Sequence, residues 1–126
     1  MTWPSSSRVA PPPAEHPIDR RVAIIDLGSN TFRLVAFSYT PDGPFAMTDE
    51  IRETVRLSAG TSDGHLHDHA ISRGVAAARM YAAYCERTAV DEVIVGATSA
   101  IRDAANQQQV LAAFRDVGLD ARVLSV

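Results

Sequence analysis

Apolar and polar positions alternate with the period of β-strands in the first half of the chain. Two runs rich in β-branched residues, 22–26 and 31–37, flank a short polar turn, and a third run, 45–56, alternates in its later half. Runs of this composition and length predict strands. The second link contains a Pro-Asp-Gly-Pro turn signal. Because both links are short, the pattern predicts an antiparallel meander of three strands.

The pattern changes to a helical period after a glycine-bearing polar loop. Apolar residues recur at spacings of three and four over about residues 68–88, which predicts a helix; they are Ile71, Val75, Ala78, Ala82 and Cys85. The run 92–97 predicts a short strand buried on both faces. Asn106 and Gln109 form a capping-box pattern for a second helix. A last strand is predicted over about 121–126.

The predicted order is therefore strand-strand-strand-helix-strand-helix-strand. Three antiparallel strands followed by right-handed crossovers give a mixed five-stranded sheet with helices packed on it. This α/β order resembles the ribonuclease-H-like fold, which also builds each half-domain of the actin-like ATPases. That fold normally has a further helix after its fifth strand, so the final helix is missing from this sequence.

Composition narrows the class of protein. Residues 1–20 contain five of the seven prolines and predict a disordered tail, which leaves 21–126 as one folded domain. The net charge of −3 argues against general binding to nucleic acids or membrane surfaces. A single cysteine, Cys85, excludes an internal disulfide and predicts a packed, unreactive thiol. With no signal peptide or membrane span visible, we expect a cytoplasmic protein.

The turn between the first two strands carries more chemistry than a hairpin needs. It reads Asp26-Leu27-Gly28-Ser29-Asn30-Thr31. Gly28 predicts a positive φ and close approach of a ligand, and the amides and short polar side chains after it suit phosphate oxygens. The carboxylate of Asp26 suits Mg²⁺ held through a water molecule. The alternative is a turn whose polar side chains bind only its own backbone.

The second motif is the stretch GATSAIRDAAN at the end of the fourth predicted strand. Thr98 ends this strand, where open α/β sheets present their ligands. Ser99 is predicted to cap a short helical turn that carries Arg102 within reach of an anion. The alternative is an exposed Arg102 paired with Asp103 or Asp91.

Together, these stretches resemble the family of exopolyphosphatases and guanosine pentaphosphate phosphohydrolases, the Ppx/GppA phosphatases. AIIDLGSNTFRLVAF is similar to the phosphate-binding hairpin of that family, and ATSAIRDAAN to its second signature. RETVRLSAG, between them, is similar to the family's link from third strand to first helix. The resemblance implies a Mg²⁺-dependent hydrolase that releases terminal phosphate from inorganic polyphosphate or the 5′ γ-phosphate from guanosine pentaphosphate.

The resemblance also implies roles for single residues. The positions that match the phosphate loop are Asp26, Gly28, Ser29, Asn30 and Thr31. Arg102 matches an arginine at the edge of the catalytic pocket, with Thr98 and Ser99 beside it as weaker candidates. Arg33 and Arg56 also fall at family positions, and we expect them to contribute weakly to binding the charge of the substrate.

One departure from the family pattern concerns catalysis. The family's catalytic base is a glutamate just after the fifth strand, whereas no glutamate follows Glu92 here. No catalytic residue is therefore assigned in this chain; the base is expected downstream of Val126, and residues 1–126 alone are expected to be inactive. An uncovered apolar sheet face favours association, so we also expect a homo-oligomer or a self-associating fragment.

Other interpretations stay open on the sequence alone. The same hairpin occurs in sugar kinases and other actin-like ATPases, which would make the chain an ATP-binding half-domain. It would otherwise be a non-catalytic phosphate-binding or assembly module. A nuclease of the ribonuclease H class needs several carboxylates around two metal ions, and the fourth strand ends without one. The alternating His65, His67 and His69 show no four-ligand metal geometry.

Overall fold

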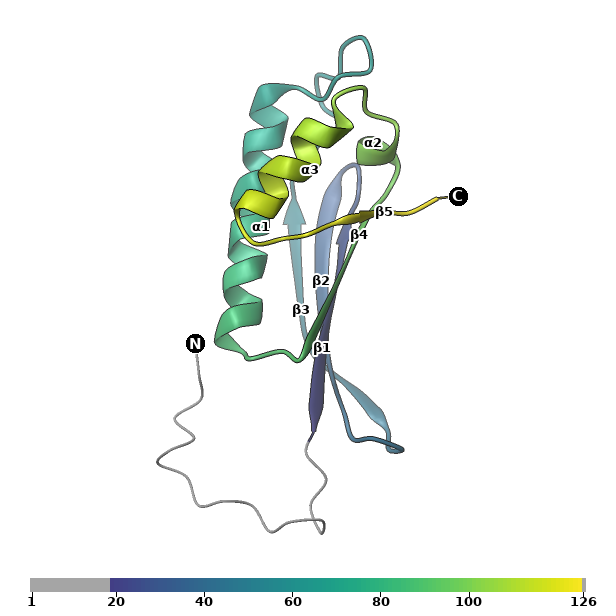
Figure 1. Ribbon diagram of the computed structural model, residues 1–126, viewed down its shortest axis with the longest axis vertical. Coiled ribbons are helices and arrows are strands. Elements are labelled where there is room, and N and C mark those ends of the chain that lie inside the picture. The colour runs from purple at the N-terminus through teal and green to yellow at the C-terminus, as the bar shows by residue number, and fades with distance from the viewer. Residues whose placement is uncertain (1–18, 126) are drawn as a thin grey trace.

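The computed structural model describes residues 19–125. Its elements are β1 (Arg20–Leu27), β2 (Thr31–Tyr39), β3 (Phe45–Thr54), α1 (Asp68–Arg87), β4 (Glu92–Ala97), α2 (Ser99–Arg102), α3 (Gln107–Asp116) and β5 (Arg122–Val123) (Figure 1). The tail predicted over 1–20 lies outside the described residues except at its end, where Arg20 already belongs to β1. None of the described helices is long and apolar enough to cross a membrane.

The sheet has the mixed five-stranded architecture that the sequence predicts. Its strand order is β3-β2-β1-β4-β5. β1 pairs antiparallel with β2, and β2 with β3, whereas β4 runs parallel to both β1 and β5. The carboxyl ends of β1 and β4 therefore meet at one edge of the sheet, where both sequence motifs begin.

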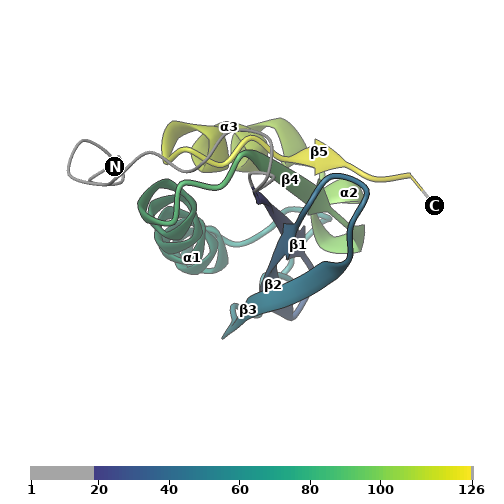
Figure 2. The same ribbon diagram turned by 90° about the horizontal axis from the view of Figure 1, so that it is seen from below.

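Helices α1 and α3 cover one face of this sheet (Figure 2). Phe32 of β2 meets Phe114 of α3 edge to face, with ring centroids 5.9 Å apart. Gly74 of α1 leaves room for this ring, because a Cβ there would lie 3.1 Å from Phe114. The hydroxyl of the fully buried Tyr81 donates to the carbonyl oxygen of Ile51 at 3.0 Å, which ties α1 to β3.

The opposite face of the sheet, which we call the open face, carries no helix within residues 19–125. Ile24, Ile94 and Leu124 emerge there and are 42%, 47% and 44% exposed. The prediction that β4 is buried on both faces is therefore wrong. Only the helix side of β4 is covered, where Val95 and Ala97 are buried.

Cys85 is a packing residue of α1, as predicted. It is buried among the core side chains. Burial raises the pKa of its thiol to about 11. The thiol therefore remains protonated at neutral pH, and a protonated thiol is a poor nucleophile.

The two long helices end with the same backbone geometry but different residues. After α3, Gly118 adopts φ +99° and the amide of Leu119 donates to Phe114. After α1, Ala89 occupies the equivalent position with φ +53°, and the amide of Val90 donates to Cys85. A left-handed conformation costs a non-glycine residue about 1–2 kcal/mol, so α1 ends with strain that α3 avoids.

We expect Ala89→Gly to raise the free energy of unfolding by about 1 kcal/mol because it removes this strain. The same substitution in the middle of α1, at the exposed Ala76, should lower it by about 1 kcal/mol through lost helix propensity. Urea unfolding with an unchanged slope gives both values. A loss of stability in both variants would contradict the assignment of the helix end.

Candidate functional site

The turn between β1 and β2 is anchored through its carbonyl groups. The carbonyl oxygen of Asn30 accepts hydrogen bonds from the amides of Val55 at 2.9 Å and Arg56 at 2.8 Å. The carbonyl oxygen of Ser29 accepts one from the amide of Ser58 at 3.2 Å. These bonds come from the segment that follows β3, so that segment fixes the conformation of the turn.

The amide groups of the same turn take no part in these hydrogen bonds. Among the turn and loop hydrogen bonds of residues 19–125, none is donated by the amides of Gly28, Ser29 or Asn30. Three successive amide donors are therefore available to a ligand. Successive backbone N–H groups of this kind form a concave site for anions.

Gly28 is required for a reason other than the predicted one. The described glycines with positive φ are Gly60, Gly64 and Gly118, so the expectation of a positive φ at Gly28 is wrong. A Cβ at Gly28 would instead lie 2.8 Å from the carbonyl oxygen of Thr31, the first residue of β2. The absent side chain lets the turn close tightly over its own backbone.

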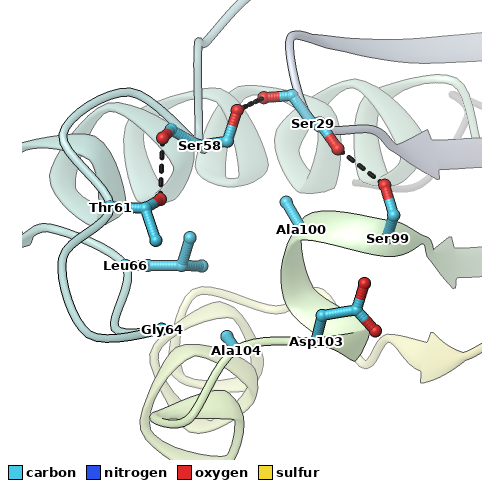
Figure 3. Close-up of a pocket in the computed structure, with 9 residues that line it drawn as sticks. All are labelled: Ser29, Ser58, Thr61, Gly64, Leu66, Ser99, Ala100, Asp103 and Ala104. Carbon is cyan, nitrogen blue, oxygen red and sulfur yellow. Dashed lines mark hydrogen bonds between the residues drawn. The ribbon is translucent and has the colours of Figure 1, made fainter.

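The second motif lies directly beside this turn. The amide and the hydroxyl of Thr98 both donate to the carbonyl oxygen of Leu27, at 3.3 Å each. The hydroxyls of Ser29 and Ser99 are hydrogen-bonded at 2.8 Å (Figure 3). Ser99 is the first residue of α2 and not its cap, because Thr98 occupies the cap position. The two motifs are thus joined at two points.

A hollow of about 380 Å³ opens beside this junction (Figure 3). Hydroxyl-bearing side chains surround it, namely Ser29, Ser58, Thr61 and Ser99. The charged side chain in its lining is Asp103. Because a carboxylate repels an anion, we expect an anion to bind at the amides of the turn and not inside this hollow.

One wall of the hollow is held by Asn106. Its side chain accepts from the amide of Leu66 at 2.9 Å and donates to the carbonyl oxygen of the same residue at 3.1 Å. It makes no capping hydrogen bond to α3. The predicted capping box of Asn106 and Gln109 is therefore wrong, because the Asn106 side chain satisfies the backbone of Leu66, which is buried and needs both partners.

Asp26 does not line this hollow but points to the open face. It is exposed, and it lines a second hollow of about 650 Å³ together with Gly96, Arg122 and Leu124. A Cβ at Gly96 would lie 2.8 Å from the side chain of Leu124. The predicted metal-binding carboxylate and the Ser29–Ser99 pair therefore line different hollows.

No group of three or more His, Cys, Asp or Glu side chains in residues 19–125 is placed to share a metal ion. Asp26 thus supplies one carboxylate and no ligand cage. The ring of His67 accepts a hydrogen bond from the amide of His69 at the start of α1 and stacks on the ring of His69. These two histidines therefore form part of the N-terminal cap of α1.

Within residues 19–125, no hydrogen bond or ion pair joins the side chain of Arg102 to the β1–β2 turn. Its guanidinium contacts Asp103 at 3.3 Å and donates to the carbonyl oxygen of Leu124 at 3.4 Å. The pairing with Asp103, which the sequence left as an alternative, is the arrangement present. An anion that binds Arg102 has to compete with this carboxylate.

Arg33 and Arg56 have different surroundings. Arg33 and Arg52 share one carboxylate oxygen of Glu50. The hydrogen bond from Arg33, and to a smaller extent that from Arg52, lowers the pKa of Glu50. The charge of Arg33 is therefore partly neutralised. Arg56 is exposed, and its guanidinium makes no hydrogen bond or ion pair within the part of the chain that the structure describes.

Sequence reasoning missed Arg73 of α1, which supports the whole arrangement. Its guanidinium donates to the carbonyl oxygens of Val55 at 2.8 Å and Arg56 at 3.0 Å. The amides of these same two residues hold Asn30. No local pattern signals this role, because the partners are 17 and 18 residues apart in the chain.

Comparison with known proteins identifies the family. The model of the Ppx/GppA phosphatase family matches residues 38–126. This chain belongs to the Ppx/GppA phosphatase family. The ATP-binding half-domain of another actin-like family is thereby set aside, and the fold is the actin-like, ribonuclease-H-like fold predicted from the element order.

Solved structures of this family superpose closely on the chain. The Ppx/GppA family member of Aquifex aeolicus is 29% identical over 85% of this chain, with a TM-score of 0.79. An exopolyphosphatase from Cytophaga hutchinsonii is 26% identical over 83%, with a TM-score of 0.78. The Aquifex aeolicus PPX-GPPA enzyme is 30% identical over 85%, with a TM-score of 0.78. The chain spans 35%, 34% and 36% of their respective lengths.

Substitutions can distinguish the hydrogen bonds from the Asn106 side chain to Leu66 from a capping box of Asn106 and Gln109. Asn106→Ala should lower the free energy of unfolding by about 1–3 kcal/mol, because two backbone groups of Leu66 lose their partners. It should also accelerate hydrogen exchange at the amide of Leu66. Gln109→Ala is the matched control and should be almost neutral, because Gln109 is exposed and takes no part in a capping box. Equal losses of unfolding free energy in both variants would contradict this assignment and favour the capping box.

Proposed function

We propose that this chain is the phosphate-binding part of a hydrolase that removes terminal phosphate from condensed phosphates. Its substrate in this proposal is inorganic polyphosphate, or guanosine pentaphosphate, from which it removes the 5′ γ-phosphate. The observation that carries the proposal is the row of three undonated amides at Gly28, Ser29 and Asn30. Membership of the Ppx/GppA phosphatase family supports it, as does the similarity to an exopolyphosphatase.

The terminal phosphate would bind across the three amides of the turn. Backbone N–H groups fixed before binding need no reorganisation when the anion arrives. Ser29 adds a hydroxyl that is already oriented by its hydrogen bond to Ser99. Arg102, which we propose as the arginine at the edge of the site, would exchange Asp103 for a phosphate oxygen.

Mg²⁺ is the cofactor in this proposal, and Asp26 is the residue that would hold it. Mg²⁺ keeps several water molecules and is commonly bound through one or two carboxylates and the phosphates of its substrate. A single exposed carboxylate at the end of β1, two residues before Gly28, fits this outer-sphere role. When bound, the ion neutralises charge on the phosphoryl oxygens.

We propose that residues 1–126 bind the substrate without hydrolysing it. The resemblance matches no residue of this chain to the catalytic glutamate, and no glutamate follows Glu92. Without a group to orient the attacking water, binding alone gives little acceleration. The exposed apolar side chains of the open face, Ile24, Ile94 and Leu124, would lead the isolated chain to self-associate.

Calorimetric titration with sodium tripolyphosphate, with and without Mg²⁺, tests the site. The wild-type chain should bind, and Gly28→Ala should weaken binding roughly tenfold or more, because the clash with Thr31 shifts the amides. Gly43→Ala, in the distant turn between β2 and β3, is the control and should bind like the wild type. Asp26→Asn should abolish the effect of Mg²⁺ and leave binding without Mg²⁺ intact.

Two outcomes would sink this function for the chain. One is a folded wild-type protein that binds no tripolyphosphate. The other is a Gly28→Ala variant that binds as tightly as the wild type, since the amides of the turn would then not hold the anion.

A further inference from the structure

Arg56 holds an unusual backbone conformation for its residue type. Its φ is +53°, in the left-handed region. Of the other described non-glycine residues with positive φ, Asp42 and Asp63 are of a type that tolerates this region, and Ala89 ends a helix. For arginine the conformation is strained, and such strain persists only where the surroundings impose it.

Hydrogen bonds on two sides of Arg56 impose this backbone conformation. On one side, the guanidinium of Arg73 binds the carbonyl oxygens of Val55 and Arg56. On the other, the amides of Val55 and Arg56 donate to the carbonyl oxygen of Asn30. All four bonds to these two residues involve their backbone, so a glycine at position 56 would make them without strain. The fold therefore gives no reason for an arginine here.

The side chain of Arg56 takes no part in holding the fold together. It is exposed, and its guanidinium has no partner within residues 19–125. By contrast, Arg33 binds Glu50 and Arg102 binds Asp103. Among the arginines that the sequence placed at the site, Arg56 is thus the one whose charge is not matched by a described carboxylate.

The position of Arg56 relates this charge to the proposed phosphate site. Its amide lies 2.8 Å from the carbonyl oxygen of Asn30, so its Cα is within one side chain's length of a phosphate on the turn amides. The terminal phosphate would already be held by three amide donors. An arginine fork beside that phosphate is suited to the next phosphate along a chain.

We propose that Arg56 is the specificity-determining residue that selects condensed phosphates over orthophosphate. Its guanidinium binds the second phosphate of a chain whose terminal phosphate occupies the amides of Gly28, Ser29 and Asn30. The strain at Arg56 is retained because this side chain is needed at this place. The proposal rests on the proposed phosphate site and adds to it a preference between ligands.

Titration of the chain with orthophosphate and with tripolyphosphate separates the two ligands. Arg56→Gln should weaken tripolyphosphate binding about tenfold and orthophosphate binding less than about twofold, because only the longer anion reaches the guanidinium. Arg56→Lys should lose less than Arg56→Gln because it keeps the charge. Arg79→Gln, at an exposed position midway along α1, removes the same charge elsewhere and should leave both affinities within about twofold of wild type.

Arg56→Gly adds a readout that is independent of charge. It should lose tripolyphosphate affinity like Arg56→Gln and at the same time unfold at a higher urea concentration than the wild type, because glycine relieves the strain. Stability and affinity should therefore move in opposite directions in this variant.

Several results would overturn the assignment of Arg56. They are equal losses for both anions, no loss for tripolyphosphate, or the same loss in Arg79→Gln. A wild-type chain that binds neither anion would overturn the phosphate site itself. A wild-type chain that binds both anions with no change in Arg56→Gln would leave the phosphate site intact and remove only the role of Arg56.

Discussion

The carbonyl oxygen of Asn30 accepts two backbone hydrogen bonds from the segment that follows β3, and the orientation of the β1–β2 turn depends on them. The carbonyl groups of Ser29 and Asn30 are thus committed to protein partners, whereas the amides of Gly28, Ser29 and Asn30 donate none of the turn and loop hydrogen bonds of residues 19–125. Arg73 holds the donor residues from the far side. Preorganised amide donors bind an anion without the cost of ordering a loop at the time of binding.

Residues at the turn line two different hollows. One is lined by the serine hydroxyls and Asp103, and the other, on the open face, by Asp26 and Arg122. A negatively charged ligand is repelled from both carboxylates, unless a cation accompanies it at Asp26. The turn itself offers backbone donors and the Ser29 hydroxyl, and the backbone of Arg56 is hydrogen-bonded to it through Asn30.

The element order and sheet type were predictable because periodicity and short links leave few topologies. The exposure of one face of β4 was not predictable, because an apolar run does not show whether another element covers each face. Ile94 is exposed because no helix of residues 19–125 covers the open face. Asn106 has the chemistry of a helix cap, yet its amide binds Leu66, 40 residues away. Such long-range use of a side chain leaves no local signal.

The candidate site was predictable to a similar extent. The motif residues Ser29 and Ser99 do meet, as two motifs at the carboxyl ends of adjacent parallel strands should. The guanidinium of Arg102 instead contacts its neighbour Asp103 and the carbonyl oxygen of Leu124. The role of Arg73 could not be predicted, because it binds backbone carbonyl groups, and every residue has one whatever its type.

The most direct test of the central claim is an amide-resolved NMR titration of the chain with tripolyphosphate. If the turn amides hold the anion, the resonances of Gly28, Ser29 and Asn30 move together and saturate at one concentration. The amides of Val55 and Arg56, already bonded to Asn30, should move much less. Saturating shifts confined to other parts of the chain, with these three amides unchanged, would contradict the account.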